Sequence, residues 1–222
     1  MTSIDQIRLE QQAAAHAPRK PHQGLVQFIS GLFHPLLTLT YVALVICLFT
    51  PVVGAPLAVK LFFVGIVFFY TMFLPALIIT LMHVFHIVGH WALRDRRDRM
   101  LPFFTNFVCY LVNALVLRHY NAFPDWIMMA YYGSVVLTFV AWIVSFWWKI
   151  SAHASANAAG ATYFLLLGFY FPDQMPLWLV LGSIVAVGAV CSTRIYLGRH
   201  TLAQVSCGVL LGILSMLTAL NF

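Results

Sequence analysis

The residues best suited to chemistry lie near the C-terminus, where Arg194 and His200 stand six positions apart. An arginine binds phosphate oxygens through paired N–H donors, and a histidine attacks phosphorus or transfers a proton near neutral pH. Gly198 lies between them and allows the chain to bend. Nearly unbroken apolar runs flank this segment, so we expect it at the level of lipid headgroups. A basic loop that only orients a membrane helix is the alternative interpretation.

A second basic segment precedes an apolar run in the middle of the chain. Four arginines lie between positions 94 and 99, and Arg96 and Arg99 are three apart at a predicted helix start. That spacing places both on one helix face and predicts a clamp for anionic oxygens. A positive-inside anchor with aspartate partners is the simpler reading.

A third segment follows the aromatic pair Trp147-Trp148, which is typical of an interfacial belt. Ser151 is a predicted helix N-cap, and free backbone N–H groups at such a helix start attract anions. Lys149 adds positive charge, and His153 is a candidate proton donor to a leaving group. Each segment alone is a weak signal.

Composition predicts an all-α, polytopic transmembrane helical bundle of about six to seven spans. Hydrophobic residues make up 62% of the chain and charged residues 8%, far from the composition of a soluble domain. The apolar runs are continuous rather than alternating, which favours helices over a barrel. We predict a membrane-embedded domain over 24–222, preceded by a flexible or surface-lying basic tail over 1–23. The predicted spans are 35–53, 58–83, 101–118, 126–147, 155–171, 176–192 and 201–221.

On this topology ten of the twelve lysines and arginines fall on one membrane face. Lys60 and Arg118 are the two exceptions. One helical hairpin separates each basic loop from the next, so the loops 84–100, 148–154 and 193–200 are expected to meet. The basic residues are too few and too close to the membrane for nucleic acid. A lipid phosphate headgroup in the bilayer is the expected partner, and a homo-oligomer is compatible with the sequence.

The order of these blocks resembles the type 2 phosphatidic acid phosphatase superfamily of membrane lipid phosphatases. The blocks read Asp95-Arg96-Arg97-Asp98-Arg99 with Pro102, then Trp148-Lys149-Ile150-Ser151-Ala152-His153, then Arg194 with five residues before His200. They are similar to a variant bacterial branch of that superfamily. The segment His34-Pro35-Leu36-Leu37 also resembles this branch. The likeness covers roughly 94–212.

The resemblance implies a lipid phosphatase that works through a phosphohistidine, with no metal or cofactor. It makes His200 the nucleophile and His153 the acid and later the base. Arg194, Arg99 and Ser151 would bind the phosphoryl oxygens, and we add Arg96 and Lys149 from their charge. Gln204 stands where the wider family has aspartate, and it is expected to orient His200 through a hydrogen bond.

Two other classes of function remain open from the residues. His83, His86 and His90 lie at spacings of three and four on one helix face, as ligands of zinc, iron or haem do. A membrane metalloenzyme of that kind normally needs more histidines and carboxylates, and no predicted span contains Asp or Glu. A non-catalytic phospholipid binder or transporter would keep the arginines without needing His200.

The lipid itself is left open, with phosphatidate, phosphatidylglycerophosphate and polyprenyl phosphates all compatible. We expect an integral protein of the bacterial inner (cytoplasmic) membrane. Arg8, Arg19 and Lys20 in the tail favour a cytoplasmic active-site face under the positive-inside rule.

Overall fold

The computed structural model describes residues 21–85, 96–119 and 123–221, with only the backbone at 96–99 and 221. Within these ranges the ordered elements are all helices. The main helices are α2 (Gln23–Leu32), α3 (Thr38–Phe49), α4 (Leu57–Phe68), α5 (Leu74–Val84), α6 (Arg96–His119), α7 (Asp125–Val144), α8 (Ala152–Tyr170), α9 (Leu177–Tyr196) and α10 (Leu202–Thr218). A π-helical turn, Phe69–Phe73, joins α4 to α5, so the two make one continuous pass.

Five stretches of the described chain are long and apolar enough to cross a membrane, which confirms the all-helical membrane class. They are Gln23–Phe49, Leu57–Val84, Met100–His119, Asp125–Val144 and Leu177–Tyr196, and α10 is a shorter apolar helix. The protein is therefore an integral membrane protein.

The predicted span 155–171 forms a full-length helix, α8, but α8 is not among these five apolar stretches. Its first half is built from small and polar residues, which lowers its hydropathy. Ala158, Ala159 and Gly160 are buried, and α8 packs against α3, α7, α9 and α10. A helix surrounded by protein does not need a lipid-facing apolar surface, and small residues let neighbouring helices come close.

The first predicted span, 35–53, starts too late. The observed stretch begins at Gln23 with α2, breaks at His34 and Pro35, and continues through α3. His34 is extended, with φ −67° and ψ 136°, because a residue before proline is pushed out of the helical region. The proline marks a break inside the pass rather than its beginning.

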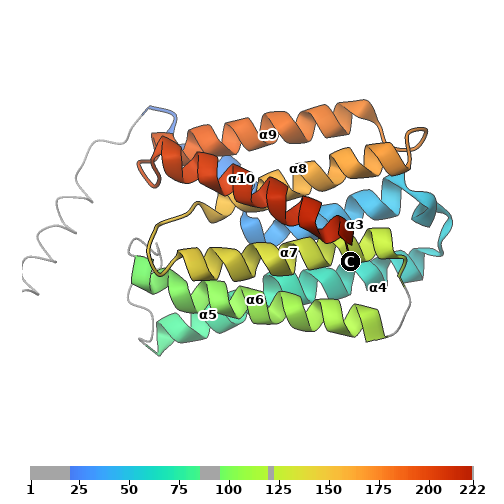
Figure 1. The fold of residues 1–222 in the computed structure, drawn as a ribbon, viewed down its shortest axis with the longest axis horizontal. Coiled ribbons are helices and arrows are strands. Elements are labelled where there is room, and N and C mark those ends of the chain that lie inside the picture. The colour runs from blue at the N-terminus through green and yellow to red at the C-terminus, as the bar shows by residue number, and fades with distance from the viewer. Residues whose placement is uncertain (1–20, 86–95, 120–122, 222) are drawn as a thin grey trace, which may run out of the picture.

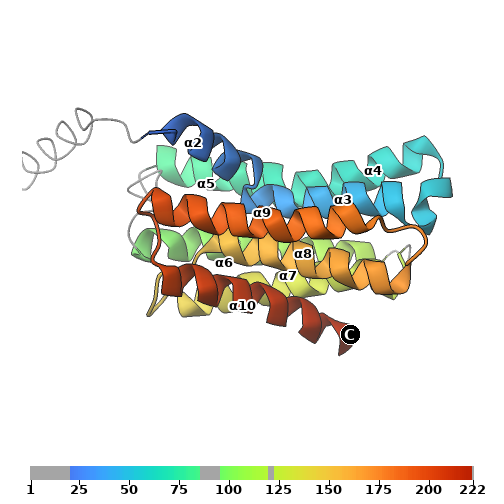
Figure 2. The ribbon, with the colours of Figure 1, turned by 90° about the horizontal axis from the view of Figure 1, so that it is seen from above.

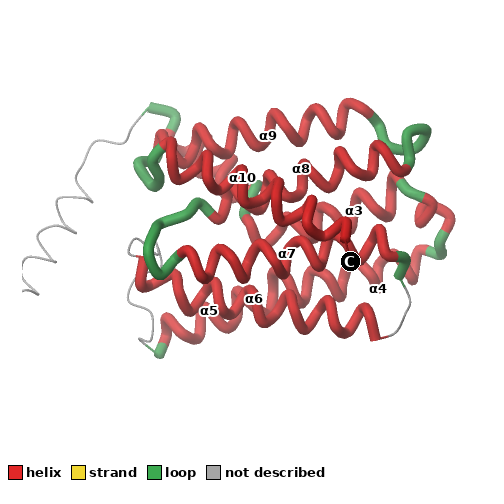
Figure 3. The backbone as a smooth tube through the Cα atoms, in the orientation of Figure 1, coloured by secondary structure: helices red, strands yellow, loops and turns green. Residues whose placement is uncertain are grey.

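The helices run back and forth, so that the described ends of the predicted basic loops lie at one end of the bundle (Figures 1 and 3). The end of α5, the start of α6, the α7–α8 connection and the α9–α10 connection all lie there. Arg118 lies near the other end, at the end of α6, where it bonds Asp125 at 3.1 Å. Lys60 lies near the start of α4, also away from the basic end.

Helices α8 and α10 start at the same end of the bundle (Figure 2) and pack against each other through two glycines of α10. A methyl group added at Gly208 would lie 2.9 Å from the Ser151 carbonyl oxygen. One added at Gly212 would lie 2.2 Å from the Ser155 carbonyl oxygen. The Gly-x3-Gly spacing is therefore a packing motif, and it joins the helix that begins beside His153 to the helix that begins beside His200.

Candidate functional site

Arg194 and His200 are joined by a tightly closed turn between α9 and α10. Gly198 has φ +66°, the left-handed conformation that glycine adopts without strain. The Gly198 N–H donates to the Ile195 carbonyl at 2.9 Å, and the Arg199 N–H donates to the Arg194 carbonyl at 3.0 Å. This pair of bonds is a Schellman motif, and it fixes the backbone of the nearby His200.

The predicted loop 193–200 is shorter than expected, because Arg194 lies in the last turn of α9. A cation at a helix C-terminus is stabilised by the helix dipole and satisfies the last carbonyl groups. The arginine is thus held on a rigid helix, with its side chain half-buried.

His200 is 7% exposed and is held by Gln204 from the first turn of α10. The Gln204 Oε1 lies 3.1 Å from His200 Nδ1 and also accepts from the Thr201 backbone N–H at 3.3 Å. The Thr201 hydroxyl accepts the Gln204 N–H in return, which completes a capping box. Because an amide oxygen only accepts, a hydrogen bond here requires the proton on His200 Nδ1, and in the neutral ring the lone pair is then on Nε2.

His153 lies in the first turn of α8, behind the N-cap Ser151. Ser151 is fully buried, and its hydroxyl accepts the Ala154 N–H at 3.4 Å. The sequence prediction of an N-cap at Ser151 is therefore confirmed. Lys149 is half-buried in the connection that leads to this helix.

Helix α2 and the turn after it form a third wall of the candidate site, beside the α7–α8 and α9–α10 connections. None of the residues of this third wall was predicted to belong to the site. Arg194 Nη1 donates to the Ser30 hydroxyl at 2.8 Å. The rings of His34 and His153 meet edge to face, with centroids 5.2 Å apart. The Leu36 N–H donates to His34 Nδ1 at 3.3 Å, which fixes the His34 ring. The weak likeness of His34-Pro35-Leu36-Leu37 to known relatives was the one sequence signal for this wall.

Asn157 ties that wall to α8. Its side-chain N–H groups donate to the Phe33 carbonyl at 3.0 Å and to the His153 carbonyl at 2.8 Å. One side chain thereby links the break between α2 and α3 to the helix turn that carries His153. Asn157 was not predicted as a site residue, since nothing local in the sequence distinguishes it from a polar residue in any helix.

The electrostatic environment of His153 is dominated by burial and by a neighbouring cation. His153 precedes the predicted span 155–171 and lies outside the five apolar stretches. Burial lowers its pKa well below the ordinary value, and the charges of Arg194, His34 and His200 lower it further, against a hydrogen bond with the Ser30 backbone. The lowered pKa favours the neutral imidazole. Arg194 and His153 both bond Ser30, one through its hydroxyl and the other through its backbone. The His200 N–H donates to the Arg194 carbonyl at 3.4 Å, so the three residues lie close together.

The remaining predicted residues are placed only in part. Arg96 and Arg99 occupy the first turn of α6 at the same end of the bundle, but their side chains lie outside the described residues. His86 and His90 also lie outside them, whereas His83 is in the last turn of α5. Among the described residues, no cluster of three His, Cys, Asp or Glu side chains could hold a metal ion.

A half-buried arginine, a histidine held through Nδ1 and a second histidine with a lowered pKa lie together at one end of a membrane-helix bundle. Such a site can bind a phosphate group and exchange protons with it. Residues 138–222 match the family model of the PAP2 superfamily, whose members are typically membrane phosphatases. This part of the chain is a PAP2 superfamily domain, and it contains His153, Arg194, His200 and Gln204. No curated protein matches the chain, and no solved structure matches it.

Proposed function

We propose that the protein is a metal-independent lipid phosphatase that hydrolyses a phosphomonoester or diphosphate headgroup through a phosphohistidine. The observation that carries the proposal is the state of His200. The Gln204 amide oxygen accepts from Nδ1, so in the neutral ring Nε2 is the nucleophilic nitrogen, next to an arginine that can bind the phosphoryl oxygens. The PAP2 match supports the same reaction class.

In the first step His200 Nε2 attacks phosphorus, and the bond from phosphorus to the ester oxygen breaks. The leaving alkoxide takes a proton from protonated His153 and departs as an alcohol. In the second step neutral His153 takes a proton from water, whose oxygen attacks the phosphohistidine. Inorganic phosphate leaves, and both histidines return to their starting state.

The low pKa of His153 is compatible with this role because substrate changes its surroundings. A phosphate dianion beside the imidazole favours the imidazolium form and counteracts Arg194. His153 is therefore protonated when the substrate binds, whereas its lowered pKa favours the neutral form in the empty site.

Phosphate binding is assigned to Arg194, Lys149 and Ser151, together with Arg96 and Arg99 from the start of α6. Arginines at several positions spread the charge of the transferring phosphoryl group. The buried start of α8 adds a helix N-terminus that favours negative charge. Gln204 orients His200 without adding charge, unlike the aspartate of the wider family.

The proposed location is the bacterial inner (cytoplasmic) membrane, with the active-site end of the bundle in the cytoplasm. The substrate is a lipid with a terminal phosphate, and the bilayer is its source. The lipid class is left to direct assay among phosphatidate, phosphatidylglycerophosphate and polyprenyl phosphates.

Purified protein should release phosphate from at least one lipid of such a panel in detergent micelles. His200→Ala should abolish release, and His119→Ala, which changes an exposed histidine at the far end of α6, should not. Brief reaction with a phosphorus-labelled substrate should leave an acid-labile, base-stable label on the wild type that His200→Ala lacks. Substrate binding without turnover by the wild type would instead favour the non-catalytic lipid binder.

A further inference from the structure

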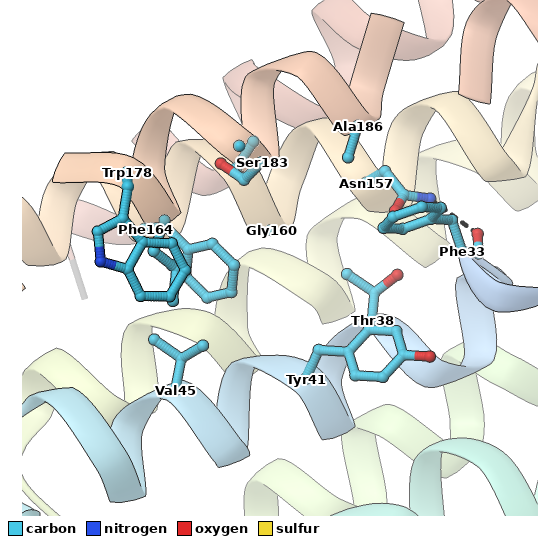
Figure 4. Close-up of a pocket in the computed structure, with 13 residues that line it drawn as sticks. Phe33, Thr38, Tyr41, Val45, Asn157, Gly160, Phe164, Trp178, Ser183 and Ala186 are labelled. Carbon is cyan, nitrogen blue, oxygen red and sulfur yellow. Dashed lines mark hydrogen bonds between the residues drawn. The ribbon is translucent and has the colours of Figure 1, made fainter. Parts of the chain in front are cut away.

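A lateral groove begins one helical turn from His153 and runs along the bundle away from the site. Its volume is about 340 Å³, and its walls come from α3, α8 and α9. Figure 4 shows Asn157 and Phe33 at one end and Trp178 with Phe164 at the other. Between these ends the lining is almost wholly apolar.

Asn157 connects the groove to the helix turn that carries His153. The Asn157 amide bonds the His153 carbonyl at 2.8 Å and the Phe33 carbonyl at 3.0 Å, and the same side chain lines the groove. On α9 the near end of the groove is Ala186, two helical turns before Arg194. A molecule in the groove therefore has one end about one helical turn from His153 and about two helical turns from Arg194.

The position of the groove within the membrane helices determines what kind of molecule fits it. Ala186 and Trp178 both line it and are eight positions apart on α9, which corresponds to about 12 Å of helix rise. Only 17% of the apolar window of α9 is buried inside the protein, so this helix faces lipid. An elongated apolar channel parallel to the spans suits a hydrocarbon chain.

Small residues create the space. Gly160, Ala161, Gly182, Ser183 and Ala186 all line the groove where larger side chains would close it. A Cβ added at Gly160 would come within 2.9 Å of Thr38 Cγ2, so the α3–α8 wall is tight. A Cβ added at Gly182 would meet nothing within 4 Å, so a side chain there would extend into open space.

We propose that this groove holds a hydrocarbon chain of the lipid whose phosphate reaches His200 and His153. The inference rests on the proposed function. Because a chain leaving the bilayer gains little hydrophobic free energy in an apolar groove, the groove acts through shape. It fixes the direction of the chain and so positions the phosphate, and it selects substrates by the chain they carry.

The variant that tests this is Gly182→Leu, which fills the groove without touching the backbone of a neighbouring helix. Gly188→Leu is its matched control, because Gly188 lies on the same helix, is also exposed and has open space around its Cβ, yet does not line the groove. Turnover is measured on dioleoyl and on dihexanoyl phosphatidate, which share headgroup and leaving group. Gly182→Leu should lower the ratio of long-chain to short-chain turnover about tenfold, the size of a typical overpacking penalty. Gly188→Leu should leave the ratio at the wild-type value, and equal ratios in both variants would overturn the proposal.

A binding readout separates this inference from the proposed function. A phosphatidate with a diazirine midway along one acyl chain is photolysed with the protein in nanodiscs. Cross-links are expected on the peptides that contain Phe164 and Leu179, and Gly182→Leu should remove them while Gly188→Leu keeps them. If the wild type hydrolyses neither phosphatidate, the cross-links still decide whether a chain occupies the groove. Cross-links confined to other helices would refute the groove even in an active enzyme.

Discussion

The contact of α8 with α10 gives the sharpest prediction, because two backbones approach there without an intervening side chain. The change is Gly212→Ala. Its new methyl group would lie 2.2 Å from the Ser155 carbonyl oxygen and 2.9 Å from the Ala159 backbone nitrogen. Ordinary van der Waals contact begins near 3.4 Å, so α10 must move from α8 by about 1 Å. Neither obstructing atom belongs to a flexible side chain that could rotate away.

The expected change in the free energy of unfolding is the difference between two opposing effects. Alanine in a helix interior gains up to about 1 kcal/mol over glycine, whereas forced repacking of this kind costs about 3 kcal/mol or more. The net loss of about 2 kcal/mol corresponds to a fall in Tm of roughly 5 °C for a chain of this size. Gly208→Ala, with its closest contact at 2.9 Å, should lose less. Gly188→Ala, with open space, should be neutral or slightly stabilising.

The order of the three losses in Tm is measured by thermal unfolding of the variants in one detergent, with tryptophan fluorescence as the signal. Turnover should follow the same order, since the contact sets the positions of the helices that begin beside His153 and His200. A Gly212→Ala protein with wild-type Tm and activity would refute the reasoning. A loss of similar size in Gly188→Ala would show that glycine matters through flexibility rather than close approach.

Further predictions concern the site and its orientation. Gln204→Asp should keep or raise turnover, because a carboxylate holds the His200 ring and stabilises its imidazolium; a collapse of turnover would show that this chain depends on the neutral amide. Arg194→Lys should fail to rescue the loss in Arg194→Ala, since an ammonium group cannot bind two oxygens as a fork, and wild-type turnover in Arg194→Lys would contradict this. Ser30→Ala should lower turnover by about tenfold through loss of the charge-assisted bond at 2.8 Å, and unchanged kinetics would remove Ser30 from the site. The pKa of His153 is lowered in the empty site and rises beside an anion, so binding takes up a proton. Tungstate should therefore bind more tightly as the pH falls from about 8 to about 6, and His153→Ala should lose that pH dependence; equal slopes in both proteins would exclude His153 as the proton acceptor. A reporter active only in the cytoplasm, fused after Phe222, should stay silent if seven passes begin with a cytoplasmic tail, and a signal would refute that topology.

Hydropathy predicted most of the helical passes because lipid offers the backbone no hydrogen bonds, and a helix satisfies its own. The second span, predicted at 58–83, is observed at Leu57–Val84. The turn between Arg194 and His200 was also readable from sequence, since a Schellman motif depends on one glycine and its immediate neighbours. The cap at Ser151 is local in the same sense.

Three features depended on contacts between distant parts of the chain. Ser30 meets Arg194 across 164 positions, and His34 meets the ring of His153; no local pattern encodes either contact. Helix α8 is too polar for a lipid-facing span, and only its place among four helices explains how it lies inside the bundle. The groove exists because small residues of α8 and α9 face α3 at one level. Sequence thus determined which segments are helical and which residues could react, because those are local properties. Tertiary packing decided which reactive residues share a site and where a lipid chain fits, because those depend on faces that only the folded bundle brings together.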